Sequence, residues 1–458
     1  MLVAWLVLSS AALAVPQDFD GRRFYSGDLH VHTGASGDGM SSDVGDCTGV
    51  CGAMSELGEA ARASGLDFIA VTDHVNGWTI SSPDLFEGAL HHVVDAHVPG
   101  EFLVIPGAEV WFELPDRSPL GHKNLMLFGS DDQVAGFDMF AAQHHGSLEQ
   151  VADCNGVWGY ASSLQDQFGP VLLIPHHPSA VIPMITDWSC QDSLWSPAVE
   201  IYSEHGNSEV PEPDFDPQWS DPAPPGTTVF EAMHPDGPGH RLGFVGGTDR
   251  HDTHAGAVCT TETAIQGPPY GGGLTMAVLG PDEFFDRDAL YAALVDRRTY
   301  ATSGPDLPAV LDVLVEGRLV GSMGQVVVVP EGSSVQVRVR VPEEHADVVE
   351  AVVFTTPDGR LQGSPDGVGA WSLPADDLPA FVYAELQVDG AAWNPDCVDG
   401  GDTDDERVWL SPVWLEPGDP QPPAVVDDGG CGCAAAAHPV GLWWVALLVG
   451  WRRRVTRV

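Results

Sequence analysis

The segment GDLHVHTGASGD, residues 27–38, places two histidines on either side of a single valine. Side chains two residues apart on an extended strand point the same way, so the imidazoles of His30 and His32 share one face. Two neutral imidazoles held this close form half of a site for a divalent transition metal. An isolated pair also occurs on ordinary solvent-facing strands, so the remaining ligands must come from elsewhere in the chain.

Potential metal ligands end nearly every apolar run before residue 304. Sixteen of the 18 histidines lie between residues 30 and 254, and aspartates and glutamates accompany them at the ends of the runs. Side chains at the carboxyl ends of several strands meet at one edge of a sheet or barrel. The candidates for one shared metal site are His30, His32, Asp38, His74, Glu109, His122, His177, Asp249 and His251.

This donor set indicates the chemistry. Imidazoles and carboxylates without thiolates favour Zn²⁺, Mn²⁺ or Fe²⁺ over Mg²⁺ or a structural zinc site. A carboxylate can bridge two such ions, and water held between them becomes hydroxide near neutral pH. We therefore predict two or three divalent transition metals (Zn, Mn or Fe) and a nucleophile for phosphorus or carbonyl centres.

Two kinds of apolar pattern divide the chain. Continuous apolar runs such as 66–74, 101–109 and 171–177 alternate with helix-like stretches such as 54–65. Strands buried on both faces and separated by helices are typical of an α/β sheet or barrel, which we predict over 20–304.

The following part of the chain, residues 305–417, alternates apolar and polar residues and carries turns such as PDG. This pattern predicts a small antiparallel β-sandwich domain without a ligand cluster. The predicted strands lie within 309–317, 334–342, 349–356, 381–388 and 407–415.

The net charge excludes one class of partner. The chain has 66 acidic and 19 basic residues, a formal charge of −47. A surface of this charge repels phosphate backbones, so we expect a small-molecule substrate and no nucleic acid. The sequence does not indicate an oligomeric state.

Both ends of the chain have features of targeting segments. Residues 1–14 form a short apolar run with an A-x-A-like end, which predicts a signal peptide and export. Residues 418–433 form a Pro/Asp/Gly-rich linker with a CGC motif, and residues 434–458 an apolar helix with an arginine-rich tail. This order resembles the MYXO-CTERM type of bacterial sorting signal. The resemblance implies a sorting protease, contact with a membrane and anchoring at the cell surface or outer membrane through Cys431 or Cys433.

The remaining cysteines fit an exported protein, in which they are expected to form disulfides. Cys47 and Cys51 favour a local disulfide over half a zinc site, because no second ligand pair accompanies them. The other pairings stay open. The six residues are Cys47, Cys51, Cys154, Cys190, Cys259 and Cys397.

Several motifs resemble those of the PHP (polymerase and histidinol phosphatase) superfamily, in the same order. GDLHVHT, VTDH, PHHP and GGTDRHD are similar to its successive motifs, whereas GHKN, EIYSEHGNSE, GFVGGTDRHD and DRRTYATSG resemble its DUF3604 branch, the CehA/McbA-like metallohydrolases. The resemblance covers about residues 25–304 and implies a distorted (β/α)7 barrel of the PHP type with up to three metals.

The resemblance also distributes the ligands. It implies a first ion on His30, His32, Glu109 and Asp249, a second on Glu109, His122 and His177, and a third on Asp38, His74 and His251. His176 is the alternative to His177, and several relatives have histidine where this chain has Asp38. Asp73 is expected to orient an imidazole.

Other residues of these motifs are assigned to the reaction. Lys123, the only lysine of the chain, adjoins His122 and is a candidate to stabilise negative charge on a transferring oxygen. Arg250 and His205 are the other candidates for this catalytic role. The expected substrate contacts are His176, Glu204 and Tyr300.

Two functions from different classes fit these features. The leading hypothesis is an exported metal-dependent hydrolase that cleaves a phosphoester or a carbamate or carboxyl ester. The alternative is a cell-surface binding or structural protein whose barrel holds metals but is catalytically silent. The chain has neither a Gly-rich nucleotide loop with lysine nor a nucleophile elbow, which argues against NTPase and serine-hydrolase activity.

Overall fold

The computed structural model describes residues 17–43, 51–75, 83–144, 151–180, 184–216, 223–258, 271–362, 369–373, 378–390 and 405–418. The predicted signal peptide, the linker beyond Gly418, the sorting tail and Cys47, Cys259, Cys397, Cys431 and Cys433 lie outside these residues. None of the helices in the described ranges has both the length and the apolarity that crossing a bilayer requires. All described residues belong to a single compact unit.

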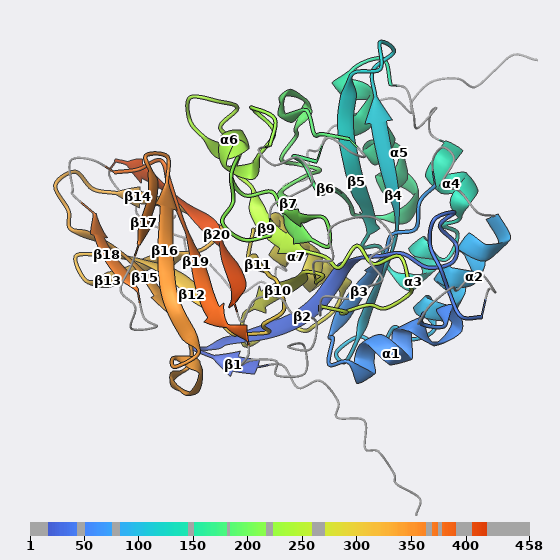
Figure 1. Cartoon of the computed structure of the whole chain (residues 1–458), viewed down its shortest axis with the longest axis horizontal. Helices are drawn as coiled ribbons and strands as arrows, with labels where there is room; N and C mark the ends of the chain where they lie inside the picture. Colours follow the sequence, from blue (N-terminus) through green and yellow to red (C-terminus); the bar gives the residue numbers. More distant parts are fainter. Residues whose placement is uncertain are drawn as a thin grey trace, which may run out of the picture. The chain divides into compact units, whose positions relative to one another are not determined.

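A sheet of 13 strands dominates a mixed α/β fold, which confirms the predicted class (Figure 1). In spatial order its strands are β17 (Gly359–Gln362), β16 (Val349–Thr356), β19 (Phe381–Asp389), β20 (Asp405–Pro417), β11 (Thr299–Thr302), β10 (Leu274–Leu279), β2 (Arg22–Val31), β3 (Phe68–Val71), β4 (Leu103–Glu113), β5 (Pro119–Leu127) and β6 (Val171–Pro175). Strand β1 (Gln17–Phe19) pairs with β2, and β14 (Val326–Val329) pairs with β20.

The remaining described strands form two smaller sheets. One contains β13 (Arg318–Ser322), β12 (Val310–Val315), β15 (Val335–Arg340) and β18 (Ala370–Leu373). The other contains β8 (Gly206–Asn207), β7 (Ala198–Ser203) and β9 (Gly243–Gly246).

The helices connect or flank the strands of the N-terminal part. They are α1 (Leu57–Ala63), α2 (Pro83–Val94), α3 (Asp131–Val134), α4 (Met139–His144), α5 (Cys154–Phe168), α6 (Val229–Met233) and α7 (Arg287–Val295). The Asp153 carboxylate caps α5 by accepting from the backbone N–H groups of the first turn. A disulfide between Cys154 and Cys190 ties the start of α5 to a short 3₁₀-helix, and Cys51 is also disulfide-bonded.

The hydrogen-bonded strands do not close into a ring. Strands β2, β3 and β4 pair in parallel, and β5 and β6 continue the sheet in antiparallel pairing. Strand β9 meets β10 through the Thr275 hydroxyl, which donates to the Gly246 carbonyl (2.6 Å) and accepts from the Gly246 N–H (3.0 Å). The Gly246 N–H and carbonyl, which could pair with another backbone in a β-ladder, are thus both bonded to this side chain. The described sheets are not closed, and the closed barrel implied by the resemblance is not shown.

Strands β12, β15, β16, β19 and β20 occupy the segments predicted to be β-structure in 305–417. Strand β14 departs from the antiparallel prediction, because it pairs in parallel with β20. The main sheet continues across the predicted boundary, since Tyr300 of β11 lies opposite Leu410 of β20. One hydrophobic core contains both Phe24 and Val408, so the two parts share their packing as well as their sheet.

Candidate metal centre

Polar side chains collect where β2, β3, β6, β7 and β9 end and where β4 and β5 face each other. Glu109 and His122 lie on adjacent strands, with Trp111 directly opposite His122. Except for Asp38, whose side chain is 12% exposed, all of the collected side chains are buried. The cluster consists of His30, His32, Asp38, His74, Glu109, His122, His176, His177, Glu200, Glu204, His205, Asp249 and His251.

Four atoms of this cluster converge on one point. The Nε2 atoms of His30 and His32 lie 3.1 Å apart. Glu109 Oε2 lies 3.3 and 3.1 Å from these two atoms, and Asp249 Oδ1 lies 3.2 and 3.3 Å from them. Corners of a tetrahedron about 3.2 Å apart are about 2.0 Å from its centre, which matches zinc bonds to imidazole and carboxylate. The five distances among the four atoms therefore fit ligands of one divalent ion.

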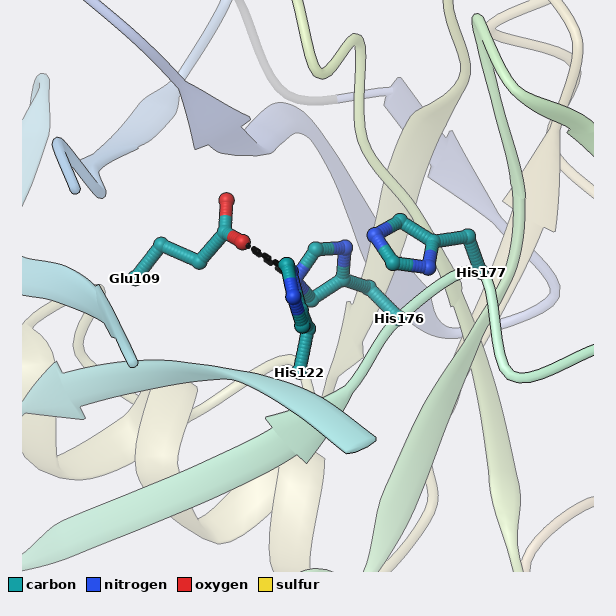
Figure 2. A group of neighbouring side chains, drawn as sticks. All are labelled: Glu109, His122, His176 and His177. Carbon is teal, nitrogen blue, oxygen red and sulfur yellow. Dashed lines mark hydrogen bonds and ion pairs between the residues drawn. The ribbon is translucent and has the colours of Figure 1, made fainter. Parts of the chain in front are cut away.

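A second group shares the Glu109 carboxylate (Figure 2). Glu109 Oε1 lies 2.5 Å from His122 Nδ1 and 3.3 Å from His176 Nε2. His177 belongs to the same group and also to a group with His205 and Asp249. Because Glu109 contributes one oxygen to each group, its carboxylate is placed to bridge two ions.

A third group lies on the other side of His32. The imidazoles of His32, His74 and His251 have ligand atoms close enough to hold an ion together. The Asp38 carboxylate lies 3.6 Å from His74 Nε2 and 3.9 Å from His251 Nε2. Asp38 is therefore beside this group, as the sequence predicted, but its distances are longer than those in the first group.

Two of these residues have unusual backbone conformations. Asp249 has φ of 56° and His177 has φ of 32°, in the region that favours glycine. Such a conformation costs about 1 to 3 kcal/mol and is concentrated at functional sites, where the surrounding structure holds it. The surrounding structure must therefore hold both residues in place, as it does for six other non-glycine residues outside the cluster.

Hydrogen bonds behind the histidines fix which nitrogen faces the cluster. Ser36 Oγ donates to Asp73 Oδ1 (3.0 Å) and so accepts from His32 Nδ1 (3.0 Å), which leaves the lone pair of His32 on Nε2. Asp73 thus orients an imidazole, as predicted, but through Ser36. His30 Nδ1 lies 2.9 Å from Glu200 Oε2, which directs His30 Nε2 to the convergence point. Partners of this kind fix the tautomer of a ligating histidine.

Burial and charge set the protonation of the cluster. Burial lowers the pKa of His74 and of His176 to about 3, so both are neutral at neutral pH, as metal ligands must be. Burial raises the pKa of Glu109, but its contacts with His74, His176 and His122 outweigh burial and hold that pKa well below the usual range. Glu109 is therefore an anion beside the neutral imidazoles of His74 and His176.

Lys123 is the first predicted reaction residue that lies elsewhere. Neighbouring residues of a strand face opposite sides, and His122 already faces Glu109. The Lys123 side chain is buried, with Nζ 6.0 Å from the ring centre of Trp158. Burial lowers the pKa of Lys123 to about 8. The structure thus does not bring Lys123 to the cluster, and its predicted action on a transferring oxygen has no geometric support.

Arg250 lies beside the cluster and is surrounded by carboxylates, one of which is Glu204 of the cluster. The Arg250 guanidinium forms an ion pair with Asp252, and its Nε lies 3.8 Å from Glu204 Oε2. Glu204 Oε1 also lies 3.8 Å from His251 Nδ1. The positive charge of Arg250 is therefore balanced by carboxylates.

His205 lies within the cluster. Its Nε2 atom is 3.1 Å from Asp249 Oδ2. The loop that carries His205 is held by the C-terminal strands, because Glu209 accepts from the Tyr383 hydroxyl (2.7 Å) and from Trp409 Nε1 (3.1 Å). The β-rich part of the chain, which the sequence left without a role at the site, therefore positions this loop.

Tyr300 lies outside the cluster. It is completely buried in the core shared with Phe24, and its hydroxyl donates to the Leu307 carbonyl (2.7 Å) and accepts from the Ala309 N–H (3.2 Å). Strand β11 lies between β10 and β20, so its side chains pack within the sheet layers. The predicted substrate contact of Tyr300 is wrong, because packing and backbone hydrogen bonds account for this residue.

Sequence reasoning missed two buried acids of the centre. Glu200 orients His30, and Asp28 accepts from the backbone N–H of Thr248 (2.9 Å) and of His30 (3.1 Å). A signal was present in each case: Glu200 is the acid inside the apolar run AVEIYS, and Asp28 lies on the same strand face as His30.

Comparison with known proteins gives no family. No family model matches the chain, and no curated protein matches it either. The resemblance to the PHP superfamily therefore remains a hypothesis that rests on the motifs themselves. What the structure adds is the set of buried histidine, glutamate and aspartate groups that could hold metal ions.

Replacing Glu200 with glutamine is expected to weaken metal binding by about tenfold to a hundredfold, the usual effect of a residue that orients a ligand. The variant loses the negative charge 2.9 Å from His30 Nδ1 but keeps the shape of the side chain. Competition with a chromophoric chelator measures the affinity. The exposed Glu87, replaced in the same way, is the control, and equal affinities of the two variants would contradict the assigned role.

Replacing Lys123 with methionine is expected to leave kcat within about twofold and to maintain or raise the melting temperature, because it removes a desolvated cation. Steady-state assays and thermal unfolding check the two effects. A folded variant with kcat lowered by more than about tenfold would restore the catalytic role predicted from the sequence.

Proposed function

We propose that the protein is a PHP-type metal-dependent hydrolase with two or three divalent transition metals (Zn, Mn or Fe) in a distorted barrel. The observation that carries the proposal is the convergence of His30, His32, Glu109 and Asp249 on one point, with Glu109 shared by the next group. Bound transition metals supply Lewis acidity and lower the pKa of water to near neutrality.

The chain's own residues complete the chemistry. Glu200 and Ser36 hold the imidazoles of His30 and His32 in the orientation that presents Nε2. His205 Nε2, 3.1 Å from Asp249 Oδ2, carries a proton at the edge of the cluster. Contacts with Asp249 and Glu204 outweigh burial and raise the pKa of His205 above its ordinary value. We assign to His205 the donation of that proton to the leaving group.

The charges around the cluster favour an uncharged substrate. The cations predicted to stabilise charge on a transferring oxygen are engaged elsewhere, Arg250 with Asp252 and Lys123 beside Trp158. Buried carboxylates such as Glu204 instead surround the metal ligands. With these side chains engaged, bound metals alone would supply the positive charge that phosphoryl-transfer sites place on their anionic substrates. We therefore propose a carboxyl ester or carbamate, rather than a phosphoester, as the bond cleaved.

A substrate panel tests this proposal. The metal-loaded full-length protein is assayed with aryl esters, aryl carbamates, phosphomonoesters and phosphodiesters, alongside His32→Ala. We expect turnover of an ester or carbamate that the variant loses. Faster turnover of a phosphoester would overturn the substrate class. Stable metal binding without turnover of any compound would favour the alternative, a cell-surface binding or structural protein.

We further propose that the protein is exported and held at the cell surface or outer membrane through its C-terminal tail. The support is the sequence alone: the apolar run of residues 1–14, the CGC motif and the arginine-rich end. The intact mass of the protein isolated from membranes tests this. Loss of the residues after Cys433 is expected, and a mass that includes them would refute processing.

A further inference from the structure

Trp111 forms an aromatic wall on one side of the metal centre. It follows Glu109 by two residues on β4, so the two side chains lie on the same face of the strand. The indole stacks on the imidazole of His122, directly opposite, with ring centres 5.2 Å apart and an angle of 17° between the planes. It meets the His74 ring at 73°, with ring centres 5.9 Å apart. His122 and His74 belong to different ligand groups, so the indole contacts both groups.

The indole is more accessible than the ligands at the convergence point. The side chains of His30 and His32 are completely buried, whereas His122 is 5% and His74 is 6% exposed. Every residue of β4 except Trp111 is buried. The indole therefore borders the accessible part of the centre at His74 and His122. A substrate that approaches the metal ligands past these two histidines meets a large apolar ring.

A row of ring contacts separates Trp111 from His205. The centre of the His122 ring lies 5.0 Å from that of His177, which in turn lies 5.1 Å from that of His205. The strands follow the same order, because β5 and β6 come after β4 in the main sheet and His205 follows β7. The indole and His205 therefore lie on different sides of the second ligand group.

This arrangement sets the orientation of an ester or carbamate in the site. In hydrolysis, hydroxide forms a bond to the carbonyl carbon, the bond from that carbon to the leaving oxygen breaks, and the leaving oxygen takes a proton. His205 is assigned as the donor of this proton, so the leaving group points towards His205. The acyl or carbamoyl group then extends in the other direction, towards Trp111. An indole packs best against apolar groups, and a second aromatic ring gains further from stacked or edge-on packing.

We propose that Trp111 determines specificity on the acyl side of the substrate, where its indole selects an aromatic acyl group such as benzoyl over acetyl. This specificity rests on the proposed hydrolase function and on proton donation by His205. A benzoyl group places a second ring against the indole, whereas an acetyl group is too short to cover it. The Asp38 carboxylate, 3.6 Å from His74 Nε2, disfavours a negative charge on the acyl group.

Two esters with the same leaving group, p-nitrophenyl benzoate and p-nitrophenyl acetate, test the proposal on the metal-loaded full-length protein. Trp111→Ala is expected to lower kcat/KM for the benzoate ester by about tenfold or more, mainly by raising KM, because the lost contact is made in both the bound substrate and the transition state. For the acetate ester, kcat/KM should stay within about twofold. Trp111→Phe keeps an aromatic ring and is expected to recover most of the loss.

The control is Trp371→Ala, which removes a partly buried tryptophan of β18 from the other end of the fold and should change neither ester. Thermal unfolding and metal analysis verify each variant, because Trp111 stacks on His122. If Trp111→Ala does not retain its metal, Trp111→Leu, which keeps apolar bulk against His122, replaces it. Its expected loss is about threefold or more, again for the benzoate ester alone.

Binding of the neutral amides benzamide and acetamide, measured by saturation-transfer NMR, gives a readout that does not need turnover. The unaltered protein is expected to bind benzamide in preference to acetamide, and Trp111→Ala is expected to lose this preference. Benzamide binding that depends on Trp111, without turnover of either ester, would contradict the proposed function and leave the aromatic subsite standing.

Three results would overturn the proposal. Equal losses for the two esters in Trp111→Ala would place the indole against the leaving group. Turnover with unchanged selectivity in a folded Trp111→Ala protein would show that the indole does not contact the acyl group, while the proposed function would stand. Absence of both turnover and benzamide binding in the metal-loaded protein would contradict the subsite and the hydrolase function together.

Discussion

Replacing Glu109 with glutamine is expected to abolish turnover and to reduce the metal content of the protein. This carboxylate contacts His30 and His32 through Oε2 and His122 and His176 through Oε1. A neutral amide keeps the shape of the side chain but cannot bridge two cations through two anionic oxygens. The variant should therefore affect two of the ligand groups at once.

The expected loss in kcat exceeds about a hundredfold. Replacing a residue that merely orients a metal ligand already lowers metal affinity or activity by about tenfold to a hundredfold. Metal analysis after desalting and steady-state assays give the two readouts. Glu113→Gln is the matched control, since Glu113 lies on the same strand but contacts Arg117 rather than the histidines. Full metal content with unchanged kcat in Glu109→Gln would contradict the bridging role.

The stability of the metal-free protein is expected to be greatest near pH 6.5. Burial lowers the pKa of His74 and of His176 to about 3, below the unfolded value of about 6.5. The unfolded chain then binds more protons, so their contribution to stability is present above pH 6.5 and is lost as pH falls towards 3.

His251 produces the opposite dependence on the alkaline side. Burial lowers its pKa, but contacts with Glu204, Asp249 and Asp38 outweigh burial and raise it to about 10. The folded state then binds more protons, so this contribution is complete below pH 6.5 and is lost as pH rises through about 10. Metal must displace that proton, so its stabilising effect is expected to grow over the same range.

Thermal unfolding with and without a chelator, from pH 4 to pH 10, measures both effects. The increase in melting temperature produced by metal is expected to widen above pH 6.5. Glu204→Gln removes the main contact that raises the pKa of His251, so its alkaline loss of stability should be smaller and should end at a lower pH. A metal effect independent of pH, or metal-free stability that rises steadily above pH 6.5, would contradict this assignment.

Local periodicity was sufficient to find most of the cluster. The two-residue period of a strand predicted that His30 and His32 share one face. The positions of His74, Asp249 and His251 at or just after the ends of apolar runs identified them as candidates. The same repeat, applied to His122, would have directed Lys123 to the other face, towards Trp158. Adjacency in sequence suggested a shared role, but adjacent strand residues face apart.

The features that the sequence did not predict depend on contacts between residues far apart in the chain. Between β9 and β10 the Thr275 side chain bonds the Gly246 backbone, and no local pattern reveals this contact. Tyr300 belongs to a motif that suggested substrate contact, but the pairing of β11 with β20 buries it in the core. The support of the His205 loop by Tyr383 joins residues that are far apart in the chain.

The metal content of the purified full-length protein tests the central claim most directly. Inductively coupled plasma mass spectrometry after desalting should find at least two transition-metal ions per chain, bound by the groups that share Glu109. The Glu109→Gln protein should hold fewer, whereas Glu113→Gln should match the unaltered protein. Fewer than two ions per chain after incubation with Zn²⁺, Mn²⁺ and Fe²⁺ in turn would contradict the account.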